Sequence, residues 1–237
     1  MGKMLGVLGG MGPAATADFL AKLVAATPAE TDQDHLSVIA QSIPTIPDRS
    51  TAILGRGPSP LPALRQGLAR LRAAGCTLAA MPCNSAHYWF DLLTPDLPML
   101  HIVDAVAAAL KQAGIERGPI GLLATGGTVA AGIYQRRLAG STRFEVLTPA
   151  PQDQVELVDA AIRLVKAGAF DAARPLVDRA VAQLRAHGSH ATVLGCTELP
   201  LVLPADANPA HPIVDSTAAL AAACVAAMRD TSLGRAA

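Results

Sequence analysis

Short apolar runs alternate with longer segments of helical pattern along most of the chain. Helices are predicted at residues 14–26, 60–74, 105–113, 129–138, 154–167, 171–187 and 217–229. Between them, strands are predicted at residues 4–8, 36–41, 77–81, 99–103, 119–124, 144–147, 191–194 and 213–215. This alternation predicts an α/β fold with mainly parallel sheets whose faces are covered by helices.

One segment interrupts the alternation. Residues 43–50 read Ile-Pro-Thr-Ile-Pro-Asp-Arg-Ser and directly follow the second predicted strand. Proline lacks a backbone N–H and restricts the residue before it, so the segment is predicted to be a loop.

Two pairs of segments repeat about half a chain apart. Residues 6–12 resemble residues 121–127, and the cysteine segment at Cys83 resembles the one at Cys196. A repeat of this length predicts two similar lobes, which we expect to comprise residues 1–102 with 214–237, and residues 103–213. Each cysteine follows a strand, and ligand sites gather at the carboxyl ends of parallel strands. Cys83 and Cys196 are therefore expected to face each other across a cleft between the lobes.

Paired thiols suggest a specific chemistry. Two thiols on opposite sides of one carbon atom can remove a proton from one face and return a proton to the other. A helix N-terminus, such as the one expected after each strand, lowers the pKa of a thiol. Either cysteine alone could instead be a buried structural residue, but the repeat favours the catalytic interpretation for both. Cys76 and Cys224 are interpreted as structural.

Other kinds of site are less well supported. Cys83 and His87 could share a helix face, but no second local pair completes a zinc site, and no metal is expected. A Cys–His dyad would leave Cys196 without a role, so His87 is expected to orient or cap locally. The glycines at positions 9, 10 and 12 do not match the dinucleotide fingerprint.

Composition and charge exclude several classes of partner. The 237 residues include 19 basic and 19 acidic side chains, with no basic cluster and only 3% aromatic residues, so nucleic-acid binding is disfavoured. No run of 18 apolar residues is free of charges and breakers, so a membrane span is not expected. Four cysteines without an export signal indicate free thiols in a reducing, cytoplasmic location.

Five segments together resemble the aspartate/glutamate racemase family, and within it the aspartate racemase branch. They occur in a similar order across nearly the whole chain, and the two cysteine motifs are the most specific of them. The segments are Gly9-Gly10-Met11-Gly12-Pro13, Ile46-Pro47-Asp48-Arg49-Ser50, Met81-Pro82-Cys83-Asn84-Ser85-Ala86-His87, Leu123-Ala124-Thr125-Gly126-Gly127-Thr128 and Leu194-Gly195-Cys196-Thr197-Glu198-Leu199.

The resemblance implies two α/β lobes related by pseudosymmetry, with the active site between them. It implies racemisation of a dicarboxylic amino acid, aspartate or glutamate, without pyridoxal phosphate, metal or nucleotide. Cys83 and Cys196 would be the acid/base pair, serving the D-face and the L-face respectively. The implied substrate-binding residues are Met11, Arg49, Asn84, Ser85, Thr125, Thr128, Lys166 and Thr197. Relatives of this kind are often dimers, so a homodimer is expected.

Two of these positions carry particular weight. Ser85 replaces the threonine common in the family and keeps its hydroxyl. Some broad-specificity relatives carry a neutral residue where Arg49 stands, so arginine favours the short acidic substrate. From the residues alone, however, Arg49 and Lys166 are interpreted as solvated surface charges.

Other functions on the same scaffold stay open. A maleate isomerase or a hydantoin racemase would reuse the scaffold and its cysteines, whereas an arylmalonate decarboxylase works with only one of them. A non-catalytic protein that binds an acidic metabolite is the alternative of a different class, although both thiols are retained.

Overall fold

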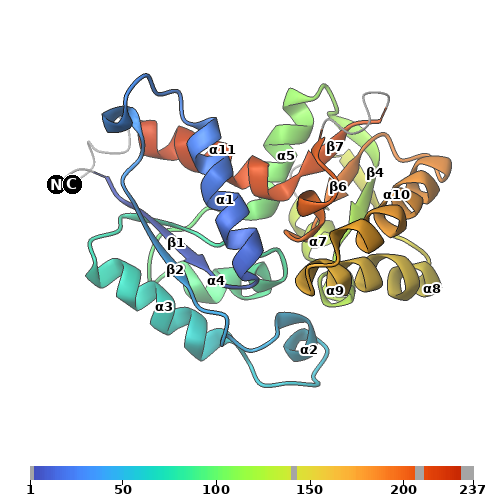
Figure 1. Ribbon diagram of the computed structural model, residues 1–237, viewed down its shortest axis with the longest axis horizontal. Helices are drawn as coiled ribbons and strands as arrows, with labels where there is room; N and C mark the ends of the chain where they lie inside the picture. Colours follow the sequence, from blue (N-terminus) through green and yellow to red (C-terminus); the bar gives the residue numbers. More distant parts are fainter. Residues whose placement is uncertain (1–2, 140–142, 206–210, 231–237) are drawn as a thin grey trace.

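The computed structural model describes residues 3–139, 143–205 and 211–230, and its strands form two parallel sheets (Figure 1). The first sheet has the order β2-β1-β3, with β1 at Leu5–Gly9, β2 at Val38–Ser42 and β3 at Leu78–Ala80. The second has the order β5-β4-β6-β7, with β4 at Arg117–Leu123, β5 at Arg143–Leu147, β6 at Thr192–Leu194 and β7 at Ile213–Asp215.

Helices flank both sheets. The first half of the chain contains α1 (Pro13–Ala26), η1 (Asp32–Asp34), α2 (Arg49–Ile53), α3 (Leu61–Ala73), η2 (Ser85–Trp89), α4 (Phe90–Leu93) and α5 (Ile102–Gln112). The second half contains α6 (Gly126–Ala130), α7 (Ile133–Ala139), α8 (Pro151–Asp153), the π-helical turn η3 (Gln154–Asp159), α9 (Ala160–Lys166), α10 (Phe170–Ala186), η4 (Leu199–Leu201) and α11 (Ser216–Arg229). None of the helices described is long and apolar enough to span a membrane.

The two sheets repeat one arrangement, as the sequence predicts. In each sheet the strand before a cysteine pairs with a central strand, β3 with β1 and β6 with β4. β1 is buried along its whole length, as expected for a parallel sheet covered on both faces. The predicted α/β fold with two similar lobes is thus confirmed.

Three groups of buried side chains hold this arrangement together. The largest includes Val7 of β1, Leu122 of β4 and Leu220 of α11, so it joins the two sheets. A second lies beneath α3, and a third lies beneath α9 and α10. Cys83 belongs to the group beneath α3 and Cys196 to the group beneath α9 and α10, so each thiol packs within its own half while the largest group joins the halves.

The end of the chain connects the two halves. β7 completes the second sheet, and α11 then packs against α1 and α5 (Figure 1). The division into residues 1–102 with 214–237 and residues 103–213 stays a proposal. Residues 213–215 lie at its boundary and pair with β6 in the second sheet.

Three local predictions need correction. The strand predicted at 99–103 is reduced to a single bridge at Met99, because His101 caps helix α5, its Nδ1 accepting a bond from the Val103 amide at 3.1 Å. The helix predicted at 129–138 is divided at Gly132, whose φ of 58° is left-handed. The predicted loop at 43–50 ends early, because Asp48 caps α2, which begins at Arg49.

Candidate active site

The carboxyl ends of the strands in both sheets surround one cavity. All ten residues singled out from the sequence line it: Met11, Arg49, Cys83, Asn84, Ser85, Thr125, Thr128, Lys166, Cys196 and Thr197. Both cysteines are buried, each about 5% exposed or less, and all four cysteines of the chain are free thiols. The cavity thus gathers residues that are up to 187 positions apart in the chain, between Met11 and Glu198.

Cys196 has a carboxylate beside it. Its Sγ lies 3.0 Å from Glu198 Oε2, where the thiol donates a hydrogen bond, and Glu198 itself is 4% exposed. Burial raises the pKa of Cys196 well above its ordinary value, and the charge of Glu198 raises it further. The lowered thiol pKa predicted from the strand-end position is therefore wrong for Cys196, because burial and a neighbouring negative charge outweigh the nearby amides.

The surroundings of Cys83 are different. Its Sγ lies 3.6 Å from the hydroxyl of Ser85. The His87 ring donates from Nδ1 to the backbone carbonyl of Cys83 at 2.9 Å. Because His87 bonds the backbone and does not line the cavity, it orients the Cys83 loop, as the sequence indicates.

Arg49 and Lys166 bring positive charge to the cavity. Arg49 is only 8% exposed, and its guanidinium donates to the carbonyls of Ile46 and Pro47 at 3.0 and 2.9 Å. Its buried Nε has no hydrogen-bond partner. Neither Arg49 nor Lys166 forms an ion pair within 4 Å of a described carboxylate. The interpretation of Arg49 as a surface charge is therefore wrong, whereas Lys166 is exposed at the rim of the cavity.

The cavity is closed in this conformation. Its free volume is about 20 Å³, which is room for about one water molecule. Helix α2 packs on α6, and Ser50 Oγ donates to Thr125 Oγ1 at 3.0 Å across this contact. Thr125 Oγ1 also lies 3.0 Å from Thr128 Oγ1. A cavity of this volume does not hold an amino acid, so lining residues must move before one binds.

One predicted substrate ligand has a different use in the structure. The side chain of Asn84 donates to Ser216 Oγ at 2.9 Å and accepts from the Tyr134 hydroxyl at 2.7 Å. The carbonyl oxygen and one of the two N–H groups of the Asn84 amide are therefore engaged within the protein, although the residue lines the cavity.

Four lining residues were not singled out from the sequence: Asp48, Ser50, Gly195 and Glu198. Glu198 was the one with a detectable signal. It follows Cys196 by two positions, as Ser85 follows Cys83, so the internal repeat places both side chains beside a sulfur.

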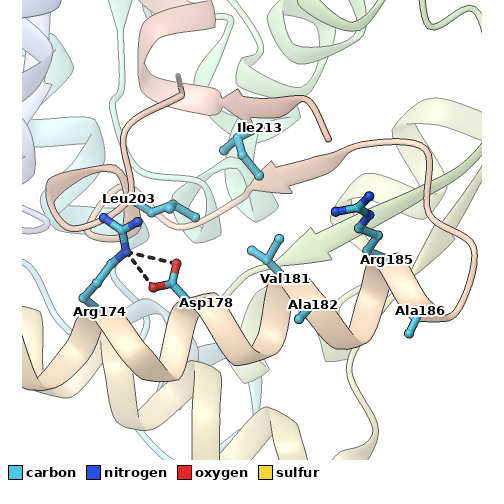
Figure 2. A pocket seen from close by; sticks show the side chains of 8 residues that line it. All are labelled: Arg174, Asp178, Val181, Ala182, Arg185, Ala186, Leu203 and Ile213. Atoms are coloured by element: carbon cyan, nitrogen blue, oxygen red, sulfur yellow. Dashed lines mark hydrogen bonds and ion pairs between the residues drawn. The ribbon is translucent and has the colours of Figure 1, made fainter. Parts of the chain in front are cut away.

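A larger and more open pocket of about 500 Å³ lies along α10 (Figure 2). Arg174 and Asp178 pair with each other there, Arg174 Nε lying 2.8 Å from the carboxylate. Arg185 adds a second cation, and Val181 and Leu203 add apolar surface. This pocket contains no thiol. Within the described ranges, no three His, Cys, Asp or Glu side chains cluster as ligands of one metal ion.

Comparison with known proteins agrees with this geometry. The family model for Asp/Glu/Hydantoin racemase matches residues 8–224, which include both cysteines. The chain belongs to the Asp/Glu/Hydantoin racemase family. The resemblance noted in the sequence is thereby confirmed.

Individual members of the racemase family match over nearly the full length. An aspartate racemase from Picrophilus torridus is 33% identical with a TM-score of 0.85, and the match covers 96% of this chain and 94% of that one. The broad specificity amino-acid racemase RacX of Bacillus subtilis is 26% identical over 94% of this chain and 96% of its own. PH1733, an aspartate racemase homologue from Pyrococcus horikoshii, has a TM-score of 0.75 at 24% identity over 97% of this chain and 100% of that one, which shows the shared fold.

Proposed function

We propose that this racemase interconverts L- and D-aspartate by a two-base mechanism in which Cys83 and Cys196 act on opposite faces of the α-carbon. The observation that carries the proposal is that both buried thiols line one closed cavity together with a buried arginine that forms no ion pair with a described carboxylate. Membership of the family supports racemisation in general. The choice of aspartate and the roles of the thiols are our inference.

The proposed reaction removes one proton from the α-carbon and adds one proton to its opposite face. One thiolate removes the α-proton, which leaves negative charge beside the substrate carboxylate, and the opposite thiol then protonates the other face. The two sulfurs exchange roles, so they titrate as a coupled pair. Because burial and the Glu198 carboxylate raise the pKa of Cys196, the free enzyme favours the arrangement in which Cys196 holds its proton.

The charged residues support an acidic substrate. A dicarboxylic amino acid brings two carboxylates, and Arg49 and Lys166 are the cations of the cavity available to them. Thr125, Thr128 and Thr197 supply hydroxyls close to the developing charge. One donor aimed in advance at such a charge is worth about 3 kcal/mol of transition-state stabilisation.

Replacement of the cysteines tests the mechanism. Cys83→Ala and Cys196→Ala should each lower racemisation of aspartate at least about 1000-fold, since each removes one acid/base group. In deuterium oxide, each variant should still exchange the α-proton of one enantiomer only, and the two variants should differ in which one. Chiral chromatography and mass spectrometry measure both effects, with Cys76→Ala as the control thiol that does not line the cavity. Undiminished racemisation in either variant would eliminate the two-base proposal.

A substrate panel tests the choice of aspartate. The wild-type protein, with reductant and no added cofactor, is assayed by circular dichroism on L-aspartate, L-glutamate, L-alanine and maleate. We expect kcat/KM for aspartate to exceed that for alanine by at least about tenfold, because alanine lacks the second carboxylate. Equal values would favour a broad-specificity racemase. Turnover of maleate alone would make the protein an isomerase of unsaturated diacids.

A further inference from the structure

Tyr134, on helix α7, is fully buried and lies outside the cavity lining. Its hydroxyl donates to Asn84 Oδ1 at 2.7 Å, and Asn84 directly follows Cys83. Burial raises the pKa of Tyr134, so the hydroxyl stays protonated and acts as a donor throughout the working range of the protein.

The ring of Tyr134 reaches the other cysteine segment. A Cβ atom built on Gly195 would lie 3.2 Å from Tyr134 Cε2, so the ring packs directly against the backbone before Cys196. One side chain thus touches the chain neighbours of both thiols, with its hydroxyl on one side and its ring on the other.

Hydrogen bonds continue from Asn84 to the second sheet. Asn84 Nδ2 donates to Ser216 Oγ at 2.9 Å, and Ser216 Oγ donates to the carbonyl of Leu194 at 2.7 Å. Leu194 ends β6, two positions before Cys196. Tyr134, Asn84 and Ser216 each donate to the next acceptor, which fixes the orientation of the Asn84 amide, and such a chain is cooperative in a buried site.

This connection matters because no strand pairing joins the two sheets in the described part of the chain. Cys83 follows β3 of one sheet, and Cys196 follows β6 of the other. A two-base reaction needs both sulfurs within reach of one carbon atom, and a misplacement of about 1 Å can cost about 100-fold in rate.

We propose that Tyr134 is a positioning residue that sets the separation of Cys83 and Cys196, with its hydroxyl holding the Asn84 segment and its ring supporting Gly195. The proposal rests on the two-base function proposed above. Tyr134 makes no contact with substrate and acts only through these two segments.

Tyr134→Phe is the decisive variant, because it keeps the ring against Gly195 and removes only the hydroxyl. We expect kcat for aspartate to fall about 10- to 100-fold while KM changes less than about threefold. The matched control is Tyr88→Phe at the other of the two tyrosines of the chain, which is 47% exposed and lies outside the cavity lining. This control should keep wild-type kinetics.

A second readout separates positioning from a purely structural role. When the opposite thiol is displaced, the carbanion lives longer, and the first thiol can exchange its proton with solvent before returning it. In deuterium oxide, the deuterium incorporated into substrate that keeps its configuration is compared with the amount of racemised product. The ratio of these two quantities should rise at least about fivefold in Tyr134→Phe. Ser216→Ala, which breaks the same chain of bonds further along, should raise this ratio in the same direction.

The outcomes are distinct. A lower melting temperature and lower kcat with an unchanged exchange ratio in both variants would overturn the positioning role and leave the proposed function intact. If Tyr134→Phe fails to fold, Ser216→Ala decides by the same ratio. If the wild-type protein racemises no amino acid, the proposed function falls and this inference falls with it.

Discussion

At the scale of single residues, Glu198 is the group that most distinguishes the two thiols. Its carboxylate accepts a hydrogen bond from the Cys196 thiol at 3.0 Å, and its charge adds to the effect of burial in raising the pKa of Cys196. No carboxylate is found to bond the Cys83 sulfur among the described residues, where the hydroxyl of Ser85 is the neighbour. The two halves of the proposed reaction therefore take place in unlike electrostatic surroundings.

Glu198→Gln tests this asymmetry. Removing the negative charge lowers the pKa of Cys196, so the pH dependence of kcat/KM for aspartate should shift to lower pH. We also expect kcat to fall at least about tenfold, because the glutamine amide can accept a hydrogen bond from the thiol but, unlike the carboxylate, cannot take its proton. The measurement is kcat/KM from pH 6 to pH 10. Ser85→Ala changes the matching position beside Cys83. In this variant, the ionisation of Cys196 should appear at the same pH in the kcat/KM profile as in the wild type. A Glu198→Gln profile that superposes on the wild type would show that the carboxylate does not control Cys196.

The residues of the cavity were largely predictable, but the state of their side chains was not. Residue type and place after a strand are sufficient to select the two cysteines and Thr125. Burial of Arg49 and engagement of Asn84 depend on distant groups, since the bonds of Asn84 reach 50 and 132 positions along the chain. No local pattern contains those partners.

At the scale of secondary-structure elements, the contact between α2 and α6 closes the cavity. The prolines at 44 and 47 do end regular structure, but the Asp48 carboxylate accepts the Thr51 amide at 2.8 Å and starts a helix immediately afterwards. Reading the segment as a loop up to residue 50 missed this cap. The helix is short, and its packing on α6 could not be predicted from periodicity.

Gly127→Ala tests the closure. A Cβ at Gly127 would lie 2.6 Å from Ser50 Cα, so the substitution forces α2 away from α6. We expect kcat/KM for aspartate to fall at least about tenfold, although alanine is the better helix former by about 1 kcal/mol and should not weaken α6 itself.

Ser50→Ala provides the graded comparison for this test. It removes only the hydrogen bond to Thr125, worth about 1 kcal/mol, and should lower kcat/KM about fivefold. Wild-type kcat/KM in Gly127→Ala would mean that α2 and α6 do not meet during turnover.

At the scale of the whole molecule, the two-lobed plan follows from the internal repeat and the alternation of strands and helices. The contacts that join the lobes do not follow from them. Ser50 with Thr125 and Tyr134 with Asn84 are pairs of ordinary polar residues whose meeting depends on how the sheets are placed. The shared apolar core determines that placement, and it is built from both halves of the chain.

Two histidines buried behind the Cys83 loop make the stability of the molecule depend on pH. His87 and His101 lie with ring centroids 4.8 Å apart, and burial lowers their pKa values to about 4 and about 3. The nearby charges of Asp104 and Arg137 pair with each other at 2.8 Å. Between pH 6.5 and about 4 the unfolded chain binds protons that the folded protein does not, so stability decreases as pH falls through this range.

His101→Asn should flatten this dependence. Asparagine can still cap α5 by accepting the Val103 amide, but it does not titrate. For His87 alone, a pKa that falls from 6.5 to about 4 corresponds to about 3 kcal/mol, and His101 should contribute a comparable amount. Urea unfolding of the wild type at pH 7, 6, 5 and 4.5 should therefore show a steep loss of unfolding free energy, and the variant should show a shallower one. His187→Gln, at an exposed position after α10, should keep the wild-type slope. If His101→Asn keeps that slope as well, His101 does not contribute to the acid sensitivity of the fold.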